Sequence, residues 1–94
     1  MTTREPEVVR FRGDNRAYTG IIVSEGTRNL HVLVAAEHVR LVNMPKAEER
    51  YATPLYWKCG AEPYPVKRAA RIILRMHRRH GGTASALRAL KELT

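Results

Sequence analysis

The sequence predicts an α+β fold in which a small antiparallel barrel or rolled sheet is followed by two C-terminal helices. Apolar residues recur with a period of two in the first part of the chain and with a helical period in the second part. The pattern changes at Pro63–Pro65, and two prolines so close together disfavour a continuing strand. We therefore expect a single domain over residues 1–94, made of a β part at 7–57, a linker at 58–65 and a basic helical hairpin at 66–94.

Four or five short strands are expected in the first part, because β-branched and aromatic residues gather there between turn residues. The expected stretches are Glu7–Arg12, Ala17–Ser24, Leu30–Ala35, Val39–Val42 and the extended segment Arg50–Trp57. Gly20 predicts a bulge or a sharp bend, and Pro54 marks an edge strand or a crossover. Turns are expected at 13–15 and 25–29, a helical turn at 43–49, and frayed residues at 1–6.

The stretch Val66–His80 predicts the first helix. Pro65 precedes it, where proline is tolerated, and Gly81-Gly82 follows it, where a left-handed cap is typical. One side is apolar and is expected to pack on the sheet or on the second helix; it comprises Val66, Ala69, Ala70, Ile73, Met76 and His77. The second helix is expected near 84–93, capped by Thr83 or Ser85. Its apolar face is expected to hold Ala84, Leu87 and Leu90, with Ala86 and Leu93 less central.

The other side of the first helix carries six basic residues within an arc of about 120°. They are Lys67, Arg68, Arg71, Arg75, Arg78 and Arg79. The segment contains no acid, and the like charges three and four residues apart oppose the isolated helix by about 1–2.5 kcal/mol in total. A polyanion along this stripe would relieve the repulsion. The alternative is a solvated face that only confers solubility; the missing acids lead us to predict that these six residues bind nucleic acid.

The net charge of +8 is concentrated in the second part of the chain. Residues 58–94 carry nine Lys and Arg against two Glu, whereas residues 1–57 carry eight against seven acids. Such asymmetry points to nucleic acid or to an anionic membrane surface. A membrane is disfavoured, because Ile73 and Met76 lack neighbouring Trp or Phe anchors and no apolar run is long enough to span a bilayer. Since the N-terminus lacks a signal-peptide core, we expect a cytoplasmic protein.

No catalytic constellation is found in the sequence, and we expect neither an enzyme nor a cofactor. Cys59 is the only cysteine, which excludes an internal disulfide and a multi-cysteine zinc site. Together with His77 and His80 it makes an incomplete metal set, so these side chains are interpreted as inert or packing residues. Trp57 and Tyr56 are interpreted as core and rim residues, the alternative being a platform for base stacking.

Two family resemblances accompany these patterns. The run VVRFRGDNRAYTGIIVSEGTRNLHVLVAAEHVRLV resembles an SH3-like small barrel of the KOW and Tudor kind, over residues 7 to about 57. This likeness implies a binding scaffold, often for nucleic acid or for another protein. The run RIILRMHRRHGGTASALRAL resembles the first two helices of a Fis-type helix-turn-helix. Because the residues end at Thr94, we expect no recognition helix and little sequence specificity.

A third likeness concerns architecture alone. A barrel, a linker and two terminal helices resemble the actinobacterial RNA-polymerase-binding protein A family, with local support from residues 57–60, from Arg78-Arg79, and from Leu87 and Leu90. The sequence therefore leaves two functions open. The first is a nucleic-acid-binding protein that grips phosphates, on DNA or on RNA. The alternative is an adaptor whose basic helix docks on an acidic protein partner, such as RNA polymerase or a component of virion assembly.

Overall fold

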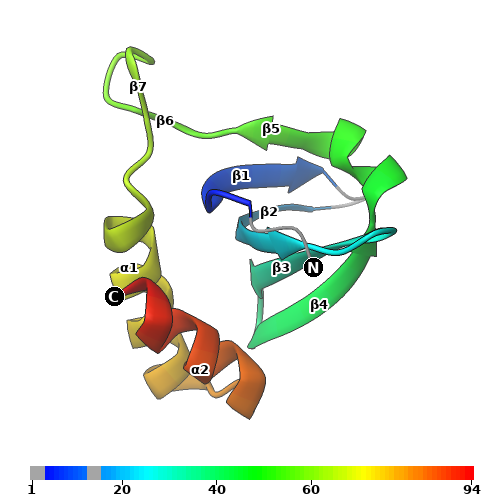
Figure 1. The fold of residues 1–94 in the computed structure, drawn as a ribbon. Coiled ribbons are helices and arrows are strands. Elements are labelled where there is room, and N and C mark those ends of the chain that lie inside the picture. Colours follow the sequence, from blue (N-terminus) through cyan, green and yellow to red (C-terminus); the bar gives the residue numbers. More distant parts are fainter. Residues whose placement is uncertain (1–3, 13–15) are drawn as a thin grey trace.

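The computed structural model describes residues 4–12 and 16–94 of the chain. The turn expected at 13–15 and the first three residues expected to be frayed lie outside the described residues. The fold is a five-stranded antiparallel sheet followed by two C-terminal helices (Figure 1). The predicted α+β class is therefore confirmed.

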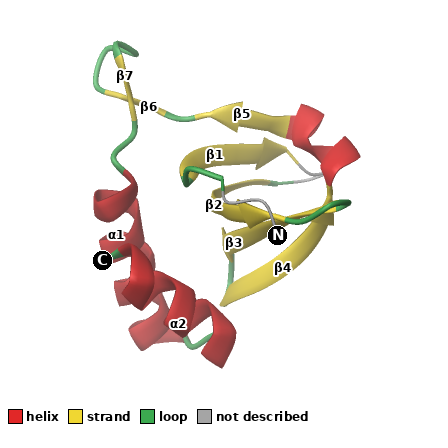
Figure 2. Cartoon of the chain, in the orientation of Figure 1, coloured by secondary structure: helices red, strands yellow, loops and turns green. Residues whose placement is uncertain are grey.

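The sheet consists of five strands that pair with their neighbours in the order β4-β3-β2-β1-β5. Their bounds are β1 Glu7–Arg12, β2 Ala17–Glu25, β3 Asn29–Ala35, β4 Val39–Pro45 and β5 Ala52–Pro54. The last strand returns to pair with the first, with Val9 opposite Pro54 and Phe11 opposite Ala52. The sheet thus curls in the manner of a small barrel, but it is not closed (Figure 2).

Both faces of this curled sheet are apolar, and each carries its own core. The inner face is covered by the curl of the sheet itself and holds Val9, Phe11, Ile22, Leu30, Val32 and Val34. The outer face packs against the helices and contributes Val8, Ile21, Leu33 and Val39. Because neighbouring residues of a strand point to opposite faces, Val8 and Val9 enter different cores, as do Ile21 and Ile22.

Three local predictions for the β part are wrong. The segment expected to turn at Asn43 continues as strand β4, with Asn43 opposite His31 and Met44 packed on the inner core. The helical turn begins only after Pro45, as the 3-10 helix η1, Lys46–Tyr51, so Arg50 and Tyr51, expected to be extended, are helical. Burial of Met44 thus keeps the backbone extended.

A bulge or a sharp bend was expected at Gly20, but the irregularity of the strand lies further along, past Ile22. Gly20 is paired regularly with Val9 and Val34, whereas the register shifts between Ile22 and Ser24. A Cβ at position 20 would lie 2.8 Å from the carbonyl oxygen of Leu33, so the glycine permits close approach of β3 rather than a bulge.

Residues 58–65, interpreted above as a linker, form most of a small hairpin and the approach to the first helix. Strand β6, Tyr56–Trp57, pairs with β7, Glu62–Pro63. The turn between them uses positive φ angles at Lys58 (53°) and Gly60 (78°). This hairpin extends away from the sheet and joins it to the helices (Figure 1).

Helices α1, Val66–His80, and α2, Ala84–Leu93, begin and end as predicted. In α1 the buried residues are Ala69, Ala70 and Ile73, whereas Met76 is half-buried. In α2 the buried residues are Ala86 and Leu90; Ala86 is therefore central and Ala84, expected on the buried face, is exposed. No helix in the described part of the chain is long and apolar enough to cross a bilayer.

The turn between the two helices is hydrogen bonded to the first residue of β4. The Val39 amide donates to the carbonyl of Gly81 (3.2 Å), and the Thr83 amide donates to the carbonyl of Val39 (3.0 Å). Nε2 of His77 donates to the carbonyl of Thr83 (3.0 Å), and the Thr83 hydroxyl accepts from the Ala86 amide (3.2 Å). Outside the turn, Nδ1 of His38 donates to the carbonyl of His80 (2.9 Å). These bonds fix the helical hairpin on the sheet.

Replacing Ile73 by alanine is expected to lower the free energy of unfolding by about 2–4 kcal/mol, because Ile73 is only 3% exposed and the change leaves a cavity. The neighbouring Ile72 is 41% exposed, so Ile72→Ala is expected to cost less than about 1 kcal/mol. Urea denaturation of both variants measures the difference. Equal losses would contradict the packing of α1 described above.

Replacing Gly82 by alanine is expected to destabilise the fold by about 1–3 kcal/mol. A Cβ there would lie 2.3 Å from the carbonyl oxygen of Val39 and 2.6 Å from the ring of His77. Gly26→Ala is the control, since its Cβ would meet nothing nearer than 3.9 Å. Thermal melts that rank the two variants in the opposite order would refute the close contact between the turn and β4.

Candidate nucleic-acid interface

The structure places all six predicted binding residues on the exposed side of α1. These residues, called the basic stripe below, are Lys67, Arg68, Arg71, Arg75, Arg78 and Arg79. Burial of Ala70 and Ile73 against the sheet turns this side of the helix toward solvent. Helix α2 contributes Ala89 and Leu93 to the same core and leaves the stripe uncovered.

Within residues 4–12 and 16–94, no salt bridge involves a residue of the basic stripe. Three glutamates instead surround Arg4: Glu7, Glu25 and Glu49. The hydrogen bond that Arg4 donates to Glu49 raises the pKa of the Arg4 guanidinium. A stripe whose guanidinium groups bind no carboxylate can donate its N–H groups to a partner.

At the start of α1, Arg68 also contacts the β6–β7 hairpin. Its guanidinium carbon lies 4.6 Å from the centroid of the Trp57 ring. The rings of Trp57 and Tyr64 pack in a T-shaped arrangement, with centroids 5.1 Å apart. The Lys58 amine lies 5.9 Å from the Trp57 centroid. Stacking uses the flat face of the guanidinium and leaves its N–H edge available to an anion.

Aromatic residues of the hairpin lie at the rim of the protein rather than in its core. Trp57 is half-buried, and Tyr56 is 53% exposed. Lys58, in the same hairpin, is a further exposed cation that sequence reasoning did not assign. The only signal for it was its place next to Trp57 in the sequence, because its approach to the Trp57 ring depends on the folding of the hairpin.

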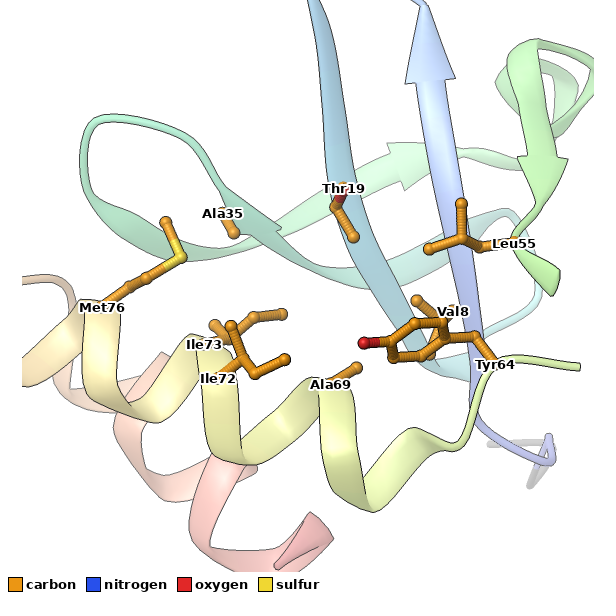
Figure 3. Close-up of a pocket in the computed structure, with 9 residues that line it drawn as sticks. All are labelled: Val8, Thr19, Ala35, Leu55, Tyr64, Ala69, Ile72, Ile73 and Met76. Atoms are coloured by element: carbon orange, nitrogen blue, oxygen red, sulfur yellow. The ribbon is translucent and has the colours of Figure 1, made fainter. Parts of the chain in front are cut away.

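An apolar groove between α1 and the outer face of the sheet was also missed. It has a volume of about 260 Å³. Figure 3 shows Ile72, Ile73 and Met76 of α1 on one side and Thr19 and Ala35 of the sheet on the other. The helical period placed Ile72 outside both the apolar side and the stripe, so periodicity alone gave no reason to single it out.

The basic stripe presents only cationic side chains to solvent. The 15 residues of α1 extend over about 22 Å, long enough to follow several phosphates. Among the described residues, no group of three or more His, Cys, Asp or Glu could hold a metal ion. Cys59 is exposed, and His77 is engaged with the helix turn.

No protein-family model matches this chain, and no curated protein or solved structure matches it significantly.

Replacing Arg71 and Arg75 together by glutamine is expected to raise the free energy of unfolding by about 1 kcal/mol at low salt. The like-charge pairs three or four residues apart in α1 are 67/71, 68/71, 71/75, 75/78 and 75/79, so each includes Arg71 or Arg75. Each pair opposes the helix by about 0.2–0.5 kcal/mol. Near 1 M salt the gain should vanish, because the Debye length falls to about 3 Å. Thermal melts at both salt concentrations measure this, and the absence of a gain at low salt would argue against repulsion within the stripe.

Proposed function

We propose that this protein binds nucleic acid through the basic stripe of α1, gripping the sugar-phosphate backbone with little sequence specificity. The single observation that carries the proposal is a row of six exposed cations on one rigid helix, with no salt bridge to any described acid. Phosphate contacts of this kind provide affinity and orientation but do not read bases.

The proposal includes the kind of scaffold. Pairing of the last strand, β5, with the first, β1, supports the likeness to an SH3-like small barrel. The pair of helices α1 and α2, joined by a short glycine turn, supports the likeness to the first part of a Fis-type unit. Both likenesses favour a binding protein over an enzyme.

The salt dependence of binding tests this function. If about four of the six cations contact phosphates, log K should fall against log salt with a slope near −3.6 on duplex DNA. Fluorescence anisotropy on duplexes of unrelated sequence, and on single-stranded DNA and RNA, measures the slope and the specificity. Similar affinities for unrelated duplexes are expected. No binding to any of these nucleic acids at low salt would overturn the proposal.

A matched pair of charge variants locates the site. Arg71→Gln with Arg75→Gln should weaken binding to all sequences alike and reduce the slope by about 1.8, since two phosphate contacts are lost. Arg28→Gln with Arg50→Gln removes the same charge from exposed residues outside α1. This control should keep the wild-type slope. Equal weakening by both pairs would indicate attraction by net charge alone.

The second candidate function is an adaptor that docks the helix on an acidic protein partner, such as RNA polymerase or a virion component. The observation that favours it is the apolar groove beside the stripe, because phosphates gain nothing from an apolar surface. The groove is argued separately below.

A further inference from the structure

The apolar groove exists because the helices cover only part of the outer face of the sheet. Val8 and Ile73 line the groove and are buried, whereas Thr19 and Ala35, which also line it, are half-exposed. On the helix side, Ile72 remains 41% exposed although it lines the groove. An apolar surface left open beside a packed core is typical of an interaction site rather than of an ordinary solvent face.

The helix side of the groove is basic. A neighbouring hollow of about 220 Å³ is lined by Ile72 and Met76, which also line the groove, together with Arg75 and Arg79. The two hollows therefore form one surface in which apolar side chains adjoin guanidinium groups. No described carboxylate forms a salt bridge with either arginine.

The sheet side of the groove carries one cation beside Thr19, whereas Glu5 and Glu7 line an adjoining hollow that shares Val8 with the groove. Arg10 of β1 lies directly opposite Thr19 of β2 in the antiparallel register, so both side chains project from the outer face. Arg10 is exposed, and among the described residues it has no salt-bridge partner. An apolar strip thus lies between cations on α1 and a cation on the sheet.

An apolar strip flanked by cations favours one kind of ligand for the groove over another. Nucleic acid would use the arginines but not the apolar strip, in which Tyr64 is the one aromatic ring among the described lining residues and so offers little for base stacking. An amphipathic helix uses both, since its apolar side enters a groove while acids at its margins meet the flanking cations. Such a segment also fits the charge of a surface that carries arginine on both sides.

We infer that the groove between α1 and the sheet binds an acidic amphipathic helix of a partner protein, with apolar side chains against Ile72 and Met76 and carboxylates at Arg75, Arg79 and Arg10. This site is distinct from the phosphate grip proposed above, although the two share Arg75 and Arg79. Lys67 and Arg71 lie on the part of the stripe away from the groove, so the two activities can be separated by substitution.

The probe is a fluorescein-labelled synthetic peptide with leucine at positions i, i+3, i+4 and i+7 and glutamate at most other positions. Anisotropy measures its affinity for the full chain at low salt. A second peptide with lysine in place of every glutamate keeps the apolar pattern and reverses the charge. Binding of the glutamate peptide, and at least about tenfold weaker binding of the lysine peptide, is expected.

Two variants separate the groove from the stripe. Ile72→Ala with Met76→Ala should weaken binding of the glutamate peptide by about tenfold or more. The same variant should bind duplex DNA with an affinity within about twofold of wild type. Lys67→Gln with Arg71→Gln should weaken binding of duplex DNA and leave the affinity for the glutamate peptide close to that of the wild type. If neither the wild type nor any variant bound DNA, the phosphate grip would be contradicted but this inference would not, because peptide affinity is measured separately.

Two controls show whether a loss of peptide binding reflects the groove rather than unfolding: a conservative variant and the wild-type chain. Met76→Leu keeps the apolar volume and should keep peptide affinity, and thermal melts report whether the alanine pair remains folded. In the wild type, peptide-induced shifts of NMR methyl signals should centre on Ile72, Met76 and Ala35. Equal peptide binding by the alanine pair, equal binding of the lysine peptide, or shifts confined to other residues would each overturn the inference. So would loss of DNA binding in the alanine pair while the wild type still binds DNA.

Discussion

Burial of one side of α1 on the outer face of the sheet is the contact on which the rest of the structure depends. Curling covers the inner face of the sheet, but Ile21 and Leu33 on the outer face would be exposed without the helices. Packing Ala70 and Ile73 against them removes this apolar surface from water. The basic stripe lies on the side of α1 opposite the buried one, so the same contact directs it toward solvent.

The turn between the helices fixes where the helical hairpin lies on the sheet. Backbone hydrogen bonds join Val39 of β4 to Gly81 and Thr83, and Gly82 lies too close to the Val39 carbonyl for any side chain. The helical hairpin is therefore held at the β4 side of the sheet, whereas the outer face near Thr19 is only half covered. One anchoring point thus accounts both for the rigid presentation of the stripe and for the open groove beside it.

Sequence patterns predicted the helices well and the sheet less well. Helix α1 begins after Pro65 and ends before Gly81, where proline geometry and glycine capping act locally. Strand β4 continues past Asn43 because Met44 enters the inner core, which is a long-range contact that no local signal contains. The same holds for Gly20, whose lack of a side chain serves the approach of β3.

The sequence by itself determined the α+β class, the bounds of both helices and the identity of the six stripe residues, because periodicity and charge are properties of the local chain. Only the tertiary structure decided that the apolar side of α1 packs on the outer face of the sheet, that Arg68 lies over the Trp57 ring, and that Ile72 and Arg10 lie on opposite sides of one groove. These features join residues far apart in the chain. Their positions follow from strand register and from the incomplete cover of the sheet, and neither can be read from a helical or strand period.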